Sequence, residues 1–239
     1  MRQFCFLDLP MKRHIPNFLT SCNLFSGCVG IVFCFSDRLL WACWAIVLAA
    51  LFDFLDGFVA RLLGVSSPIG KELDSLADCV TFGVLPATII FVLLKGLTPD
   101  PYLPFSAFLL AVFSALRLAK FNIDTRQSDA FIGVPTPANA LLIGSLPLIM
   151  THQAEFAPYF LRLEVLLPFI VLMSYLLVAE LPLFALKFKN YAWAGNQIRY
   201  IFLLLALLLL LSLQYLAVPI VIALYVVLSG LEKFVFQKP

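Results

Sequence analysis

The sequence has 239 residues, of which 62% are hydrophobic and only 13% are charged, with a formal net charge of +2. A soluble domain is usually about 45–50% apolar and about 25% charged, so the composition excludes an ordinary soluble fold and makes lipid the solvent for much of the surface. The small net charge gives no sign of a nucleic-acid partner, and we expect none. Two histidines, and six cysteines without a C-x-x-C pair, favour neither a zinc site nor a disulfide framework.

Apolar runs separated by charged or Pro- and Gly-containing segments predict an all-α, polytopic membrane bundle in a single domain, residues 1–239. A helix needs roughly 20 residues to cross the hydrocarbon core, and about eight runs approach that length. The first run is long for a signal peptide and no cleavage-like site follows it, so we expect it to be retained. The break between the last two runs, near Gln214 to Pro219, is the least sharply marked boundary. The predicted spans are 18–35, 39–60, 74–94, 102–119, 133–151, 163–185, 199–214 and 217–235.

The basic residues test the number of spans and its orientation. With a cytoplasmic N-terminus, eight spans place 13 of the 16 Lys and Arg residues on the cytoplasmic side, and only Arg38, Lys95 and Arg162 on the other. Cytoplasmic loops of membrane proteins carry such an excess of positive charge. We therefore expect both termini in the cytoplasm.

The first predicted span carries polar and small residues at helical spacing. Asn17, Thr20 and Asn23 recur every three residues and are suited to capping or to hydrogen bonds between helices. Ser26 and Gly30 form a small-x-x-x-small pair, which favours close helix packing and offers some support for a homodimer.

Four carboxylates lie where the second and third spans would be inside or close to the membrane. Asp53 lies about two helical turns inside Arg61, roughly 12 Å at 1.5 Å per residue. A carboxylate at that depth costs several kcal/mol unless it faces partners or water. Four acids within 26 residues therefore need a common explanation. They are Asp53, Asp56, Asp74 and Asp78.

In the second span, small residues share a helix face with the acids. At about 100° per residue, Asp56 and Gly57 lie on either side of Asp53, and Ala60 lies almost directly in line with it. Arg61 lies at the edge of the same face. Residues with almost no side chain beside carboxylates leave room for a phosphate-bearing ligand, whose oxygens Arg61 can contact.

In the third span, Asp74 and Asp78 are one helical turn apart, and Gly70 lies one turn earlier. The loop between the two spans is short, so the helices should be antiparallel neighbours with the four carboxylates converging on one gap. Four like charges cannot share a low-dielectric site unless some are protonated or cations neutralise them. Oxygen-only ligation suits Mg²⁺, with Mn²⁺ or Ca²⁺ as alternatives.

The spacing alone leaves three hypotheses open. The first is metal-assisted phosphoryl chemistry, the second is a cation or proton transporter, and the third is a structural ion-pair network. The predicted topology opens the acid cluster to the cytoplasm at membrane depth. That position suits a substrate with a nucleotide head and a lipid tail.

The acids and their small neighbours carry a resemblance to a known family. The pattern D-x-x-D-G-x-x-A-R-x8-G-x-x-x-D-x-x-x-D of CDP-alcohol phosphotransferases is matched at every fixed position between Asp53 and Asp78. The resemblance implies an enzyme with a divalent metal site, of two ions, held by Asp53, Asp56, Asp74 and Asp78. For Asp78 it implies a role as metal ligand, as general base, or as both.

The same resemblance implies a pocket for the CDP group. Gly57, Ala60, Arg61 and Gly70 would line that pocket, by analogy with the family. The family's habit of pairing also adds support for a homodimer.

Other segments resemble the branch of the family that makes phosphatidylserine. Residues 75–87, with Thr81 where serine is more usual, are similar to this branch, as are residues 15–24, 117–122 and 133–138. The resemblance implies transfer of a phosphatidyl group from CDP-diacylglycerol to L-serine, with release of CMP. Cys79 follows the last aspartate, which argues against the glycerol phosphate and inositol branches. Another enzyme of the family, using glycerol phosphate or a different head-group alcohol, stays an alternative.

Three polar residues near the cytoplasmic end of the fourth span are candidates for contacts with the acceptor or with lipid phosphate. They are Arg117, Lys120 and Asn122. For the two basic residues, ordinary anchoring at the membrane surface is the competing interpretation. We expect an integral protein of a bacterial cytoplasmic membrane, with membrane lipid around it and the active site facing the cytoplasm.

Overall fold

A computed structural model describes residues 12, 14–124, 131–183 and 196–236 of the chain. Its helical elements follow one another with short connections, and a single pair of two-residue strands is described with them. In chain order the elements are α1 (His14–Phe35), α2 (Leu39–Leu63), α3 (Pro68–Asp78), η2 (Cys79–Val84), α4 (Leu85–Lys95), η3 (Leu103–Phe108), α5 (Leu109–Ile123), β1 (Phe131–Ile132), α6 (Thr136–His152), α7 (Ala157–Phe160), α8 (Leu163–Val178), β2 (Pro182–Leu183), α9 (Gln197–Leu213), η4 (Gln214–Leu216) and α10 (Ala217–Phe236).

The predicted helical membrane architecture is confirmed, and each of the eight predicted spans overlaps a helical segment. Among the described residues, five stretches are long and apolar enough to cross a membrane: His14–Phe35, Leu39–Leu63, Pro68–Lys95, Leu103–Ile123 and Gln197–Gly230. The last of these covers both α9 and α10, which Gln214 separates in the structure. Six basic residues used to orient the chain lie outside the described residues: Arg2, Arg13, Arg126, Lys187, Lys189 and Lys238.

The third span begins earlier than predicted because its first turn is capped. Gly64 ends α2 in the left-handed conformation with φ 62°. Ser67 then accepts a hydrogen bond from the Gly70 N–H at 3.0 Å, and Pro68 occupies the first turn of α3. The span predicted at 74–94 therefore starts six residues earlier, and α3, the π-helical turn η2 and α4 run on as one rod.

Two other boundaries are decided by backbone conformation. Helix α8 ends at Val178, not at residue 185 as predicted, because Ala179 is extended and the chain continues into β2, which pairs with β1. The break predicted near Gln214 is present: this residue has φ 50°, and the Gln153 side chain bonds both the Leu213 carbonyl and the Leu216 N–H.

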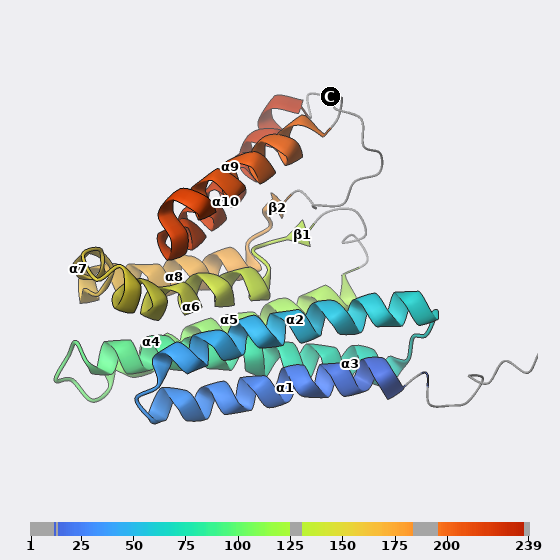
Figure 1. Cartoon of the computed structure of the whole chain (residues 1–239), viewed down its shortest axis with the longest axis horizontal. Helices are drawn as coiled ribbons and strands as arrows, with labels where there is room; N and C mark the ends of the chain where they lie inside the picture. Colours follow the sequence, from blue (N-terminus) through green and yellow to red (C-terminus); the bar gives the residue numbers. More distant parts are fainter. Residues whose placement is uncertain (1–11, 13, 125–130, 184–195, 237–239) are drawn as a thin grey trace, which may run out of the picture.

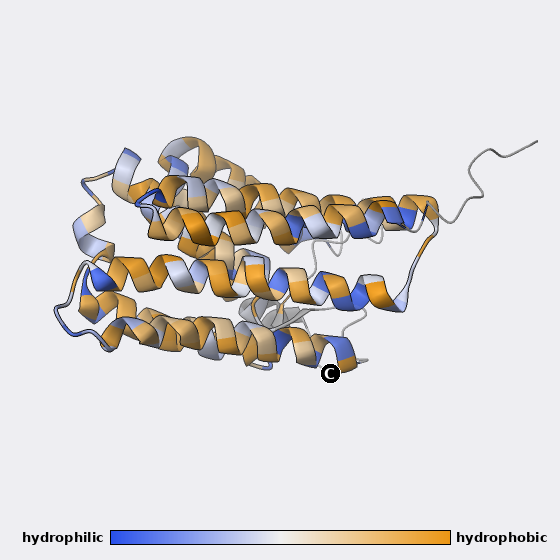
Figure 2. Ribbon diagram, turned by 90° about the horizontal axis from the view of Figure 1, so that it is seen from below, coloured by the Kyte–Doolittle hydropathy of each residue, from blue (hydrophilic) through white to orange (hydrophobic). Residues whose placement is uncertain are grey.

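The helices form successive layers (Figure 1). Helices α1 to α5 pack side by side, α6 and α8 cover one side of them, and the α9–α10 hairpin lies beyond α6. Most of the helical surface is apolar, and hydrophilic residues gather toward one end of the long helices (Figure 2). That end holds the acidic residues of α2 and α3.

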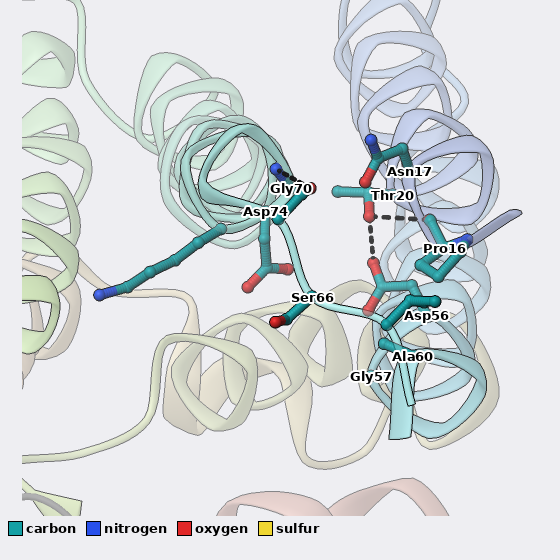
Figure 3. Close-up of a pocket in the computed structure, with 12 residues that line it drawn as sticks. Pro16, Asn17, Thr20, Asp56, Gly57, Ala60, Ser66, Gly70 and Asp74 are labelled. Atoms are coloured by element: carbon teal, nitrogen blue, oxygen red, sulfur yellow. Dashed lines mark hydrogen bonds between the residues drawn. The ribbon is translucent and has the colours of Figure 1, made fainter. Parts of the chain in front are cut away.

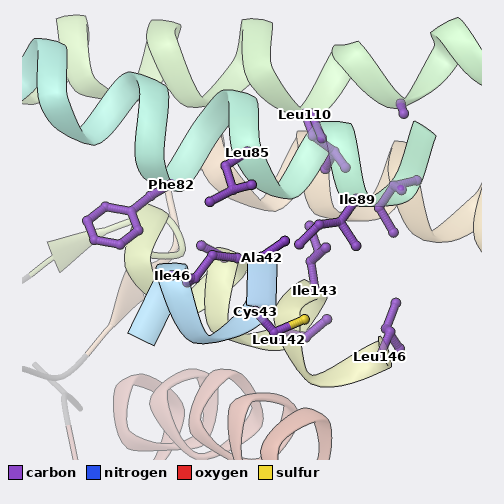
Figure 4. Packing of buried hydrophobic residues seen from close by; sticks show 14 of the residues in the cluster. Ala42, Cys43, Ile46, Phe82, Leu85, Ile89, Leu110, Leu142, Ile143 and Leu146 are labelled. Carbon is purple, nitrogen blue, oxygen red and sulfur yellow. The ribbon is translucent and has the colours of Figure 1, made fainter. Parts of the chain in front are cut away.

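The apolar core lies deeper in the bundle, where η2 and α4 meet α2 and α6 (Figure 4). Phe82, Leu85 and Ile89 are fully buried there against Ile46 of α2 and Ile143 of α6. This packing fixes the angle at which α2 and the α3–α4 rod approach, and so places the acids that precede and follow it.

The small residues of α1 are used within the chain. A side chain at Gly30 would meet Leu85 and Ala45, and the buried Ser26 hydroxyl donates to the Cys22 carbonyl. The predicted close packing at the Ser26–Gly30 pair is therefore confirmed within the chain, and the homodimer stays a prediction.

Candidate active site

Three of the four predicted carboxylates converge between α2 and α3. Asp53, Asp56 and Asp74 each offer one oxygen such that these atoms all lie within 4.8 Å of one another. A short loop, Gly64 to Ser67, joins the two helices and reverses the direction of the chain. Asp56 is buried and the other two are half-buried, so the cluster faces a recess and not open lipid.

Asp78 lies one turn deeper on α3 than Asp74 and is also buried. Its carboxylate is close enough to repel those of Asp53, Asp74 and Asp56 electrostatically. Asp78 is not among the three acids whose oxygens meet within 4.8 Å. The structure thus separates a group of three carboxylates from a fourth on their inner side.

Helix α1 supplies hydrogen bonds to the acids from one side. The Thr20 hydroxyl donates to Asp56 Oδ2 at 2.6 Å, and the Asn23 amide donates from Nδ2 to Asp78 Oδ1 at 3.2 Å. The hydrogen bonds predicted from their spacing of three residues are therefore confirmed for Thr20 and Asn23. Each bond fixes the orientation of a carboxylate that would otherwise be free to rotate.

A cleft of about 270 Å³ opens beside the acids, between α1 and the α2–α3 connection (Figure 3). Asp56 and Asp74 form part of its wall, and Gly57, Ala60 and Gly70 form another part, as predicted from their helix faces. The further lining residues are Pro16, Asn17, Thr20, Val65, Ser66, Ser67 and Lys71.

Glycine is needed at Gly70 because other side chains occupy the space a Cβ would take. A Cβ there would lie 2.9 Å from both Asn17 Oδ1 and Ser67 Oγ. At Gly57 the constraint is weaker, since the nearest atom is Arg61 Nη1 at 3.5 Å. The guanidinium of Arg61 thus lies beside Gly57, but Arg61 is not among the residues that line the cleft, and its contact with an anionic ligand stays a prediction.

The three residues predicted to contact the acceptor are not brought together. Arg117 is buried and lies near enough to Asp78 to interact with it electrostatically. Lys120 is exposed one turn further along α5. The Asn122 amide donates to Ser75 Oγ at 2.8 Å, so it connects α5 to α3. Their substrate contacts stay predictions.

Lys71, Ser66 and Ser67 are cleft residues that the sequence did not single out. Lys71 also donates from Nζ to the backbone carbonyl of Asn122 at 3.1 Å. A local sequence pattern could have identified them: Ser-Ser-Pro before a helical run predicts a capped first turn, whose N–H groups face the loop. Such a turn next to paired acids is a good position for recognising phosphate.

The residues present fit a divalent metal. The donor set is oxygen only, and Asp74 Oδ1 is buried without a hydrogen-bond partner among the described residues. An unpartnered carboxylate oxygen at the meeting point of three acids is the arrangement that a hard cation stabilises. Ligation by these residues stays a prediction.

Comparison with protein families gives one match over most of the chain. A family model described as CDP-alcohol phosphatidyltransferase matches residues 13–181. The matched region contains the acids, the cleft and the polar end of α5, whereas α9 and α10 lie beyond it.

Curated relatives from distant organisms carry one name, CDP-diacylglycerol–serine O-phosphatidyltransferase. The chain is 34% identical to that of Helicobacter pylori strain J99 over 225 residues, which is 92% of this chain and 91% of the relative. It is 40% identical to that of Saccharomyces cerevisiae over 146 residues, 54% of this chain and 52% of the relative. It is 39% identical to that of Methanocaldococcus jannaschii over 129 residues, 54% and 58% of the two chains.

Proposed function

The chain belongs to the CDP-alcohol phosphatidyltransferase family, and on that premise we propose that it is a CDP-diacylglycerol–serine O-phosphatidyltransferase. It makes phosphatidylserine and CMP from CDP-diacylglycerol and L-serine, as one step of phospholipid synthesis. The observation that carries the proposal is the group of three carboxylates within 4.8 Å beside a cleft whose walls include glycine and alanine.

In this proposal the cleft binds the CDP end of the lipid substrate. Gly57, Ala60 and Gly70 allow the pyrophosphate to approach the α2 and α3 backbones, and Arg61 contacts phosphate oxygens from the edge. The diacyl tail then lies in lipid beside the helices. A site at membrane depth therefore accepts both ends of the substrate without removing the tail from the bilayer.

Transfer is a displacement at the lipid-side phosphorus. The serine hydroxyl oxygen forms the new bond to phosphorus, the bond to the bridging oxygen breaks, and CMP leaves with that oxygen. Asp78 accepts the hydroxyl proton, because it lies on the inner side of the acid group and is oriented by Asn23. Thr20 holds Asp56 in place during this step.

Asp53, Asp56, Asp74 and Asp78 would hold two divalent ions, Mg²⁺ or Mn²⁺ with Ca²⁺ as an alternative. Bound there, the ions would neutralise the pyrophosphate and the charge that develops in the transition state. The carboxylates otherwise repel one another, so ion binding is expected to stabilise the fold as well.

We also propose that the cleft faces the cytoplasm of a bacterial cell and that both termini lie on that side. The excess of basic residues in the predicted cytoplasmic loops supports this orientation. In it, Lys120 lies exposed at the surface end of α5, where it can contact lipid phosphate. A homodimer stays a prediction from the resemblance.

The test is CMP release by purified protein in detergent micelles that contain CDP-diacylglycerol and Mg²⁺ or Mn²⁺. Serine, glycerol 3-phosphate and inositol are supplied in turn, and a chelator is added in a parallel series. We expect release that requires both serine and metal. Release with a different alcohol would preserve the transferase and overturn the acceptor. No release with any acceptor from folded protein would favour a cation-coupled transporter instead.

A further inference from the structure

A second group of polar side chains is buried where α5 and α6 both pack against η2, the turn that follows Asp78 in the chain. Arg117 of α5 and Asn139 of α6 are 8% and 0% exposed, and Thr136 at the start of α6 is 0% exposed. Arg117 donates from Nη1 to Thr136 Oγ1 at 3.5 Å, so α5 and α6 meet at this point. Asn139 lies one turn beyond Thr136, on the same side of α6.

The connection before α6 is built to hold these residues in place. Gly133 has φ 75°, and a Cβ there would lie 2.6 Å from the Leu177 carbonyl. The next residue, Val134, donates its backbone N–H to the Leu176 carbonyl at 3.0 Å. The end of α8 therefore holds the loop that precedes α6 in one position, and this fixes where α6 begins relative to Arg117.

Several atoms of this group have no hydrogen-bond partner among the described residues. They are Arg117 Nε and both side-chain atoms of Asn139, Oδ1 and Nδ2. Buried polar groups are nearly always hydrogen-bonded, and leaving an amide without either of its bonds is costly in a low-dielectric interior. Such an arrangement is typical of a site that a polar ligand completes.

The position of Arg117 relative to Asp78 indicates which kind of ligand this polar group would bind. Arg117 interacts electrostatically with Asp78, the residue assigned above to accept the acceptor's hydroxyl proton. The phosphate cleft lies on the other side of the acids, between α1 and the α2–α3 connection. A molecule that presents its hydroxyl to Asp78 from the side of α5 therefore brings its remaining groups toward Arg117 and the first turn of α6.

We propose that Arg117 and Asn139 recognise the amino-acid end of the acceptor, an inference that rests on the proposed function. The Nε edge of the guanidinium binds the α-carboxylate, and the Asn139 Oδ1 atom accepts a hydrogen bond from the α-ammonium group. Thr136 orients the guanidinium through its contact with Nη1. The pair selects an amino-acid alcohol over glycerol 3-phosphate, which has no ammonium group, and over inositol, which has neither charge.

The experiment assays each protein variant with each acceptor. Wild-type protein, Asn139→Leu and Arg117→Lys are assayed for CMP release with serine, with ethanolamine, which lacks the carboxylate, and with 3-hydroxypropionate, which lacks the ammonium group. Ser145→Ala is the matched control, since Ser145 is buried on the same helix but bonds its own backbone at Leu142. Melting temperature and the KM for CDP-diacylglycerol are measured for each protein.

We expect the KM for serine to rise about tenfold or more in both variants, while the KM for CDP-diacylglycerol changes less than about twofold. Asn139→Leu should have no further effect on 3-hydroxypropionate, and Arg117→Lys little further effect on ethanolamine, because the missing substrate group already removes the contact. If a variant fails to fold, the test is made on the wild-type protein alone, which should use serine much better than either ethanolamine or 3-hydroxypropionate.

Equal serine KM in wild type and variants, or wild-type indifference to both analogues, overturns the inference and leaves the proposed function intact. A loss of melting temperature with unchanged serine KM shows that the group only supports the fold, and overturns it as well. Failure of the wild-type protein to use serine at all counts against the proposed function itself.

Discussion

Helix α2 is buried in two different ways along its length. Its first half packs Ala42, Ile46 and Ala49 into a dry core with no exposed surface. Its second half carries Asp53 and Asp56 toward a cleft, and the buried Asp56 is held by a hydrogen bond from α1. Helix α2 thus has a core end, which contains Ala42, Ile46 and Ala49 and is held by apolar packing. Its acid end contains Asp53 and Asp56, and the arrangement there depends on charge.

The difference shows why a membrane-embedded enzyme can keep costly carboxylates. The core end fixes α2 and the α3–α4 rod mainly through apolar packing, so the acid end can hold like charges close together. Close packing at one end supports an arrangement at the other that would not be stable alone. Substitutions at the two ends should therefore fail in different ways.

The largest effect is expected at the acid end, for Asp78→Asn. Loss of the proton acceptor should lower the rate of CMP release by about 10²–10⁴-fold, while the melting temperature should not fall, because one of four repelling charges is removed. Glu72→Gln on the same helix is the control, since Glu72 is exposed. Unfolding of Asp78→Asn, or retained activity, would contradict the separation of the two ends.

Gly27→Ala is expected to damage the fold and not the chemistry. A Cβ at Gly27 would overlap the hydroxyl and backbone of Thr81 in η2, so α1 must move away, at a cost of about 1–3 kcal/mol of unfolding free energy. Thermal melting in detergent measures the loss. Gly57→Ala is the matched comparison: it has room for the methyl group, should keep its melting temperature, and should raise the KM for CDP-diacylglycerol.

Thr20→Val tests the contact between α1 and the acid end. The substitution keeps the shape but removes the 2.6 Å hydrogen bond to Asp56, so kcat/KM should fall about ten- to a hundredfold, the usual value of a bond to a charged group. Thr20→Ser should restore most of it. Thr88→Val removes a hydroxyl that bonds only its own helix at Val84, and should leave kcat/KM unchanged.

The smallest effect is expected for Asn122→Ala, which removes the 2.8 Å bond to Ser75 that connects α5 to α3. Unfolding free energy should fall by about 0.5–1.5 kcal/mol, because the bond is only partly buried. The double variant with Ser75→Ala should be no less stable than Asn122→Ala alone. Additive losses would show that the two side chains act separately.

Much of the site was predictable because helical geometry is regular. The face shared by Asp53, Asp56, Gly57 and Ala60 follows from 100° per residue, and the structure places the acids and both small residues beside one cleft. What helical periodicity could not supply was the approach of other elements. The separation of Arg117, Lys120 and Asn122 depends on how α5 packs, since residues two to five positions apart on one helix can meet different neighbours.

The sequence by itself predicted the helical membrane architecture and the positions of the charged residues along its helices, because hydropathy and local geometry act over a few turns. Tertiary structure alone decided that Asp78 lies on the inner side of the other acids, that Asn23 orients it, and that Asn139 is fully buried. The bond from Asn23 to Asp78, for example, joins residues 55 positions apart. Their distances depend on the packing of whole helices, which the local pattern of a chain does not contain.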